Sequence, residues 1–274
     1  MYVSVAVMDN GIFRHMDFDT RIAGFADFVG RKKYLYDDNG HGTHVAGIIA
    51  GSGKGSNGKY RGIAPDTFLV SVKVLDKSGN GKIENVVEAA GWIIENKSAM
   101  NIRVVNISFG TRAKMENGPA IETGEDDYAL IMAVEKMWDS GIVVVAAAGN
   151  NGPGNTSVTA PGISKKIITV GAFDDKNFFS GRGPTRECIV KPEVVVTGSN
   201  IIACNNHQGR YSSKSGTSMA APVVSGAVAR LIKNNPDITP KEVKIWMKSC
   251  CKKINVPSEK QGWGVLDIRK FVTG

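Results

Sequence analysis

Short runs of apolar residues divide the first two thirds of the chain and set its expected architecture. Five runs are rich in valine and isoleucine and have the length of strands: 3–8, 68–75, 103–109, 142–148 and 167–172. Between them, apolar residues recur at helical spacing over 83–96 and 128–140. Strands that are apolar throughout and alternate with helices are typical of a parallel sheet with both faces covered. We therefore predict a single α/β domain over residues 1–274, with a mostly parallel sheet and helices on both faces.

The last third of the chain is expected to be helical. Residues 217–232 are almost all small or apolar, which predicts a helix running through the core, with Pro222 in its first turn. Thr239 and Glu242 have the spacing of a capping box, and Pro240 follows the cap directly. This pattern predicts a further helix that begins after Thr239.

Composition and charge exclude several classes of protein. Hydrophobic residues make up 42% of the chain and charged residues 22%, which is ordinary globular usage. The longest apolar run, 142–148, is far shorter than the roughly 20 residues that span a bilayer. The net charge of +8 is scattered along the chain instead of forming a basic stripe. We therefore expect neither a nucleic-acid partner nor a membrane, and the sequence leaves the oligomeric state open.

The cysteines and the first residues suggest a cellular location. The four cysteines show no CxxC spacing, which fits a reduced compartment better than a disulfide scaffold. Residues 1–7 lack a basic segment followed by a long apolar one, so no signal peptide is visible. We expect a cytoplasmic protein. The alternative is a secreted mature form from which upstream segments have been removed.

Three segments carry side chains with catalytic potential. Asp9 follows the first strand run, His41 opens a glycine-rich stretch, and Ser218 begins the apolar helix. A serine hydroxyl becomes a nucleophile when a base takes its proton, and a carboxylate can hold that base in the required tautomer. A serine at a helix N-terminus also lies beside backbone N–H groups that stabilise an oxyanion.

Each of these residues also has an ordinary structural interpretation. Asp9 precedes Asn-Gly and could be a turn residue, and Ser218 could be a helix N-cap. His41 and His44 are three residues apart and could chelate a metal, although no third ligand is nearby in the sequence. A buried structural role is the favoured interpretation of His44.

Four segments together resemble the subtilisin family of serine peptidases. They are VAVMDNG at 5–11, NGHGTHVAG at 39–47, VVAAAGN at 144–150 and SGTSMAAPVVSG at 215–226. Their order matches that of the family, and the resemblance covers nearly the whole chain. It implies a serine endopeptidase with Ser218 as nucleophile, His41 as general base and Asp9 as the residue that orients His41. Asn150 would then donate to the oxyanion together with the backbone N–H of Ser218.

The resemblance also implies a cleft that binds an extended peptide by strand addition. Two segments would hold the peptide backbone, and a third would form one wall of the S1 pocket, with Thr159 at its floor. A threonine there predicts a shallow pocket that favours small or medium P1 side chains. The implied substrate-binding residues are Leu75, Ser78, Gly79, Asn80, Gly81, Ser108, Phe109, Gly110, Ala147, Ala148, Gly149 and Thr159.

The chain also departs from the family pattern. The N-terminal arm is short and no prodomain is visible. Of the family's calcium ligands only Asp17, and weakly Asn57, have counterparts, and the loop around Asn57 is basic. We therefore expect no required cofactor and hold calcium doubtful. Residues 111–127 form a polar insertion, either a plain loop or a lid.

We predict an enzyme of regulated processing or turnover. The competing hypothesis is a peptide-binding module with an inactive protease fold.

Overall fold

The chain folds around one large sheet that is parallel except at one edge. The computed structural model describes residues 2–111 and 124–273. The strand order is β10-β11-β7-β6-β5-β4-β1-β3-β2, and β10 pairs antiparallel with β11. A separate antiparallel hairpin consists of β8 and β9. The strands are β1 Ser4–Asp9, β2 Ile22–Asp27, β3 Phe68–Lys73, β4 Ile102–Ile107, β5 Val143–Ala147, β6 Ile168–Ala172, β7 Val194–Val196, β8 Ile201–Cys204, β9 Tyr211–Lys214, β10 Cys251–Lys252 and β11 Val265–Leu266.

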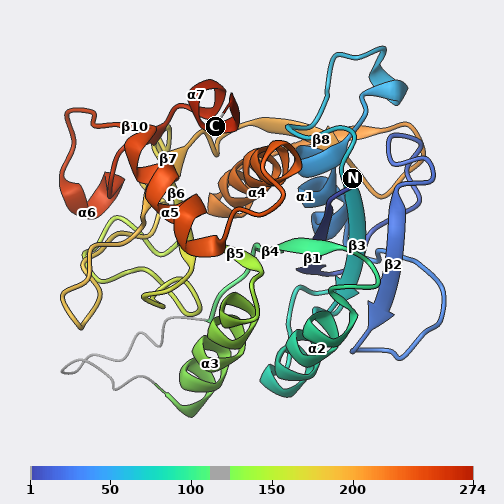
Figure 1. Cartoon of the computed structure of the whole chain (residues 1–274), viewed down its shortest axis with the longest axis horizontal. Coiled ribbons are helices and arrows are strands. Elements are labelled where there is room, and N and C mark those ends of the chain that lie inside the picture. The colour runs from blue at the N-terminus through green and yellow to red at the C-terminus, as the bar shows by residue number, and fades with distance from the viewer. Residues whose placement is uncertain (1, 112–123, 274) are drawn as a thin grey trace.

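Helices cover both faces of this sheet, as predicted (Figure 1). α2 and α3 lie together against one face, while α1 and α4 pack against each other on the opposite face. The helices are α1 His41–Ala50, α2 Ile83–Asn96, α3 Glu125–Asp139, α4 Thr217–Asn234, α5 Pro240–Ser249, α6 Ser258–Gln261 and α7 Ile268–Thr273, and a 3-10 helix, η1, spans Lys54–Ser56.

The apolar strands divide their side chains between two cores. In β1, Val5 and Val7 face the core under α1 and α4, whereas Ala6 and Met8 face the core under α2 and α3. Successive side chains of a strand point to opposite faces, so a strand covered on both sides is mostly apolar. This is the physical reason why the valine-rich runs predicted the sheet correctly.

The ends of several predicted elements need adjustment. α2 has the predicted ends, and the capping box of Thr239 and Glu242 begins α5 as expected. α3 begins at Glu125, inside the segment predicted as a polar insertion, and its acidic first turn complements the helix dipole. The rest of that insertion, residues 112–123, lies outside the described residues. Pro222 lies inside α4, beyond its first turn, so its predicted position was wrong.

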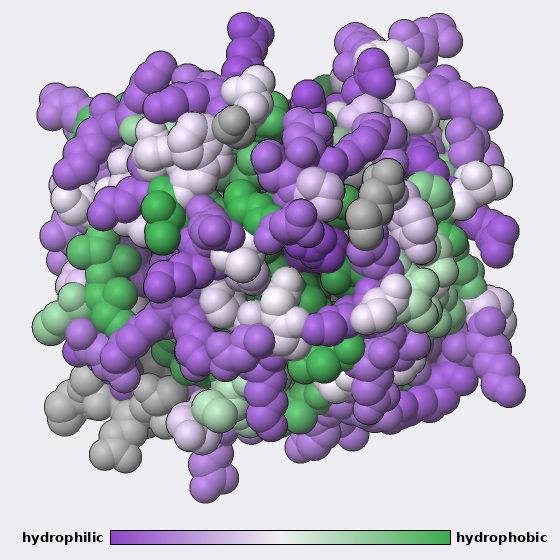
Figure 2. Space-filling view, viewed as in Figure 1, coloured by the Kyte–Doolittle hydropathy of each residue, from purple (hydrophilic) through white to green (hydrophobic). Residues whose placement is uncertain are grey.

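The surface and the cysteines agree with the composition. Figure 2 shows hydrophilic side chains over most of one face, with apolar ones in small separate groups. Within the described part of the chain, no helix is both long and apolar enough to cross a membrane. Cys188, Cys204, Cys250 and Cys251 are all free thiols.

Candidate active site

Asp9 ends the strand at which the winding of the sheet reverses direction. From β1 the chain continues to β2 and β3 on one side, and then crosses to β4 on the other side. Such switch points place the carboxyl ends of neighbouring strands around a crevice. Asp9 is fully buried there, and its carbonyl oxygen accepts hydrogen bonds from the N–H groups of Val74 (2.9 Å) and Leu75 (3.2 Å). The Asp9 carboxylate is therefore held at a site where ligands gather in this class of fold.

His41 reaches Asp9 because α1 begins directly against the turn after β1. The backbone is so close that a Cβ on Gly42 would lie 2.1 Å from the carbonyl oxygen of Gly11. Asp37 fixes this helix start by accepting hydrogen bonds from the N–H groups of Gly40 (2.7 Å) and Thr43 (2.9 Å). As a result His41 Nδ1 lies 2.9 Å from both carboxylate oxygens of Asp9.

This pairing sets the tautomer and the basicity of His41. Because Nδ1 donates its proton to a carboxylate, Nε2 remains as the proton acceptor. Burial lowers the pKa of His41, but the charge and hydrogen bond of Asp9 raise it more, so the net pKa lies above the ordinary value of 6.5. Lys214 opposes this shift with its positive charge. A quarter of the His41 side chain, 25%, is exposed, which leaves the imidazole accessible from the surface.

Ser218 is the second residue of α4, and its hydroxyl contacts the residue that follows β4. Its Oγ donates to the carbonyl oxygen of Ser108 at 2.8 Å. Its own carbonyl oxygen would normally accept from residue 222, but Pro222 has no N–H. The hydroxyl of Ser108 donates to that carbonyl instead, at 2.9 Å. Because Pro222 leaves this carbonyl oxygen free, two hydrogen bonds join Ser218 to Ser108.

Asn150 is oriented by the first residue of α4. Its Oδ1 accepts from both the N–H and the hydroxyl of Thr217, each at 3.0 Å. The hydroxyl of Thr217 in turn accepts from the N–H of Gly149 at 3.1 Å. With its oxygen engaged in this way, Asn150 presents the NH₂ group as a donor. The Ser218 N–H belongs to the first turn of α4, whose N–H groups have no partner within the helix. These two donors suit an oxyanion.

The two segments implied to hold a peptide leave the sheet on either side of β1. Leu75 is buried just beyond β3, and residues 78–81 form an exposed turn in which Asp76 Oδ1 accepts from the N–H groups of Ser78 and Asn80. Beyond β4, Ser108 is buried, Phe109 is half-buried and Gly110 is exposed. β3 and β4 both neighbour β1, so the crevice above Asp9 lies between the two segments.

Thr159 lies between Gly110, in a segment implied to hold the peptide backbone, and Gly149, in the segment implied to form one wall of the S1 pocket. A Cβ on Gly110 would be 2.3 Å from Thr159 Oγ1, and one on Gly149 would be 2.7 Å from it. Ala147 and Ala148 of the implied wall are both buried. The threonine side chain therefore fills the space between Gly110 and Gly149, and its place at the floor of an S1 pocket stays a prediction.

His44 has the buried structural role that the sequence favoured. Its Nε2 lies 3.1 Å from the carbonyl oxygen of Ile201 and 2.9 Å from that of Ser212, which ties α1 to the β8–β9 hairpin. Burial lowers the pKa of His44 to about 4. The side chain is therefore neutral at physiological pH.

Asp17, the first candidate calcium ligand, is surrounded by hydrogen-bond donors. Its Oδ1 accepts from the N–H of Gly55 (2.9 Å) and its Oδ2 from the N–H of Gly53 (3.0 Å), while the Tyr211 hydroxyl lies 2.9 and 3.0 Å from the two oxygens. Calcium requires oxygen ligands whose lone pairs face the ion. Asn57, the second candidate, is exposed at the end of η1 and is not among these partners within the described chain. The residues around Asp17 do not fit a calcium ion.

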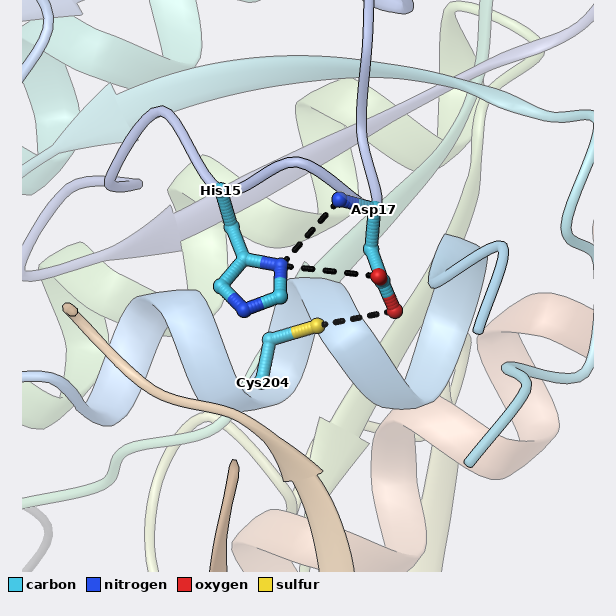
Figure 3. A group of neighbouring side chains, drawn as sticks. All are labelled: His15, Asp17 and Cys204. Atoms are coloured by element: carbon cyan, nitrogen blue, oxygen red, sulfur yellow. Dashed lines mark hydrogen bonds and ion pairs between the residues drawn. The ribbon is translucent and has the colours of Figure 1, made fainter. Parts of the chain in front are cut away.

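One group of possible transition-metal ligands occurs in the described part of the chain, formed by His15, Asp17 and Cys204 (Figure 3). Their ligand atoms lie within 4.8 Å of one another. However, His15 Nδ1 accepts from the Asp17 N–H at 3.1 Å, and the Cys204 thiol donates to Asp17 Oδ2 at 3.5 Å. Burial raises the pKa of this thiol, which disfavours the thiolate that a metal needs. Hydrogen bonding alone accounts for the arrangement.

Sequence reasoning missed three residues that support the site. Asp37 fixes the start of α1, Asn106 donates to the Ser108 hydroxyl at 2.9 Å, and Lys73 is a buried cation beside the turn after Asp9. No helix was predicted over 41–50, so Asp37, four residues before α1, carried no signal that marked it as fixing a helix start. Asn106 and Lys73 lie inside strand runs that contain other polar residues, and the contacts that distinguish them, with Ser225 for Asn106 and with Asn10 and Asp38 for Lys73, come from segments far away in the sequence.

Comparisons with known proteins agree with this geometry. The chain matches the subtilase family over residues 2–264. It is 42% identical over 274 residues to the serine protease AprX of Bacillus subtilis (strain 168), covering 90% of this chain and 60% of AprX. It is 31% identical over 273 residues to the minor extracellular protease Epr of the same strain, covering 99% of this chain and 38% of Epr. The chain thus spans less than two thirds of either relative. Its fold is similar to that of sphericase, with a TM-score of 0.80 and 26% identity, covering 96% of this chain and 90% of sphericase.

Proposed function

The chain belongs to the subtilase family, and from this premise we propose that it is a serine endopeptidase that forms an acyl-enzyme on Ser218. The observation that carries the proposal is the pairing of His41 Nδ1 with both oxygens of the buried Asp9 carboxylate. This pairing leaves Nε2 free to act as a base on the side of the imidazole that is open to substrate.

The reaction begins when the Ser218 hydroxyl turns from the Ser108 carbonyl toward His41. Nε2 takes the proton while Oγ attacks the carbonyl carbon of the peptide bond. The oxyanion that forms accepts from Asn150 and from the Ser218 N–H, and loss of one such donor typically costs about 10²–10³ in kcat. The imidazolium then protonates the leaving amine as the C–N bond breaks. A water molecule, activated by the same Nε2, hydrolyses the acyl-enzyme and restores Ser218.

The substrate is proposed to be an extended peptide or protein segment held by residues 75–81 and 108–110. Pairing with backbone groups binds a chain without selecting its sequence, so side-chain pockets set the preference. The position of Thr159 between Gly110 and Gly149 supports a shallow S1 pocket and a preference for Ala, Leu or Met at P1.

Replacement of Thr159 tests the pocket directly. Thr159→Gly removes the side chain from the floor and should improve kcat/KM for Phe at P1 relative to Ala. One methylene in a pocket is worth about 1–3 kcal/mol, so a change of about 10-fold or more is expected. Profiling with a P1-varied peptide library measures the ratio. A wild type that already prefers Phe, and is unchanged by Thr159→Gly, contradicts the assignment.

We propose that the reaction needs no metal or other cofactor. The proposed steps use only side chains and backbone groups of this chain, and the Asp17 oxygens that would bind calcium already accept from protein donors.

The relatives give the expected cytoplasmic location no support, whereas the name of Epr is compatible with export. We therefore propose the exported alternative, which detection of the protein in culture medium would support. Regulated processing or turnover stays a prediction, to be checked by profiling the cleavage products in the source organism.

A serine-reactive fluorophosphonate probe separates an enzyme from an inactive peptide-binding module. The probe should label the native protein at Ser218, and mass spectrometry of the labelled peptide identifies the site. Ser218→Ala is the control for specificity, and Ser225→Ala controls for another serine of α4. Absence of labelling in the folded wild type would overturn the proposed function.

A further inference from the structure

Lys73 places a positive charge in the interior of the protein, next to the turn that follows Asp9. Only 1% of the residue is exposed, and it pairs in register with Asp9 in the parallel β1–β3 ladder. Its ammonium group donates to three acceptors: the carbonyl oxygens of Asn10 (2.5 Å) and Leu75 (2.9 Å), and Asp38 Oδ1 (2.7 Å). The Tyr36 ring lies 4.9 Å from the ammonium. Burying an ammonium group costs free energy unless hydrogen-bond acceptors surround it. We therefore expect Lys73 to hold these partners in place.

The three acceptors belong to three different parts of the proposed site. Asn10 follows Asp9, and its N–H donates to Asp9 Oδ1 at 2.8 Å. Leu75 opens the segment proposed to bind the peptide backbone. Asp38 lies three residues before His41, next to Asp37, which fixes the start of α1. One ammonium group thus joins the segments that carry Asp9, His41 and part of the substrate cleft.

Close packing would transmit any displacement of these segments to the catalytic pair. A Cβ on Gly11 would lie 2.1 Å from the Tyr36 carbonyl oxygen, just as Gly42 has no room against Gly11. The segment before α1 therefore cannot move without pushing on the turn after Asp9. A misplacement of about 1 Å at a catalytic group can cost about 10² in rate.

We propose that Lys73 is a positioning residue for the Asp9–His41 pair: its ammonium group fixes the turn after β1 against the segment that leads into α1. This inference rests on the proposed function for its kinetic consequence. The geometric part, the orientation of His41 toward Asp9, stands without it. Lys73 itself does not contact the reacting atoms.

Lys191 provides a matched control. It too is fully buried and donates to a backbone carbonyl, that of Ile167 (3.2 Å), and to a carboxylate, that of Glu193 (2.8 Å). It lies three residues before β7, and β7 is four strands away from β1, or roughly 19 Å at the usual strand spacing. Lys73→Met and Lys191→Met therefore both remove a buried cation, but only one of them is next to the triad.

The experiment compares these variants in the full chain. Lys73→Met should lower kcat about 100-fold, after correction for the fraction of active sites titrated, with little change in KM. Lys191→Met should lose stability without this loss of kcat. Lys73→Arg, which keeps the charge, should recover part of the rate. Asp38→Asn, at a half-exposed position, should lower kcat in the same direction and keeps the test valid if Lys73→Met does not fold.

Titration of His41 by NMR in the Ser218→Ala background provides a readout that does not depend on activity. Lys73→Met should move the His41 pKa down toward 6.5, because a displaced Asp9 stabilises the imidazolium less, whereas loss of the Lys73 charge alone would move this pKa up. Lys191→Met should leave it unchanged. Equal kcat and equal His41 titration for the Lys73 and Lys191 variants would overturn the positioning role. An unlabelled, inactive wild type with the expected His41 shifts would instead overturn the proposed function alone.

Discussion

Two pairs of aspartate and histidine occur among the described residues, and the pKa values of their histidines shift in opposite directions. Asp9 and Asp17 are both fully buried, and each has a histidine nearby, His41 and His15. The first pair is joined at 2.9 Å, and the pKa of His41 is raised. In the second pair the Nδ1–Oδ1 distance is 3.7 Å, and burial lowers the pKa of His15 by more than the charge of Asp17 raises it.

The difference lies in what else surrounds each pair. His15 Nδ1 accepts from the backbone N–H of Asp17, and its Nε2 lies 3.1 Å from the Arg210 carbonyl oxygen. Both nitrogens of the neutral ring therefore have a hydrogen-bond partner. The Asp17 oxygens are occupied by Tyr211 and by backbone N–H groups. At the other pair, His41 Nδ1 itself donates to the carboxylate. A carboxylate raises the pKa of a neighbouring histidine when the ring nitrogen donates a hydrogen bond to it. The rise is much smaller when the carboxylate oxygens already accept hydrogen bonds from other donors.

Replacing each aspartate by asparagine should show the largest contrast. Asp9→Asn should lower kcat about 10⁴-fold while the fold stays intact, because the amide cannot hold His41 in its tautomer. Asp17→Asn should leave kcat nearly unchanged but lower the free energy of unfolding by about 1–3 kcal/mol, because its NH₂ group would face N–H donors. Steady-state kinetics and urea denaturation measure the two effects. Comparable losses of kcat in both variants would refute the division of roles.

The pH dependence of kcat/KM should follow His41 and ignore His15. Catalysis requires neutral His41, so activity rises about tenfold per pH unit until the His41 pKa is passed. Since Asp9 raises that pKa, the midpoint of the acidic limb should lie above 6.5. His15 already has a lowered pKa and is not part of the reaction. His15→Gln should therefore leave the midpoint in place; a displaced midpoint would show that the two pairs are coupled.

The Tyr211 hydroxyl should contribute to stability through Asp17. Burial and the Asp17 contact raise the pKa of Tyr211 to about 12, so the hydroxyl remains a donor at neutral pH. Tyr211→Phe should lower the free energy of unfolding by about 1.5–3 kcal/mol, as expected for a hydrogen bond to a charged group. Tyr60, whose ring centroid lies 5.1 Å from that of Tyr211, supplies the control Tyr60→Phe. Equal stabilities of the two variants in chemical denaturation would argue against this role.

Chelation should have the smallest effect. Backbone N–H groups point at the Asp17 oxygens, and a cation there would be repelled by them. The Tm of the native protein should therefore be the same in EDTA and in calcium chloride. A Tm that falls in EDTA and recovers with calcium would mean that an ion binds elsewhere or displaces these donors.

The sequence was informative where a local pattern has one physical cause. Apolar runs predicted β1, β3, β4, β5 and β6 because strands covered on both faces are mostly apolar. β2 was missed because it is a half-exposed edge strand with a glycine and two alanines, and β7 because it has only three residues. The four motifs pointed to Asp9, His41, Ser218 and Asn150, whose catalytic roles stay predictions.

The sequence alone therefore determined the covered sheet, the main helices and the residue types of the triad. Only the tertiary structure decided how the polar groups are used. It showed that Asp17 is satisfied by hydrogen-bond donors, that Ser108 replaces the N–H which Pro222 lacks, and that Lys73 joins three segments of the site. The physical reason is that burial depends on patterns within a segment. The role of a carboxylate, a carbonyl or an ammonium depends on which distant segments bring donors and acceptors within hydrogen-bonding distance.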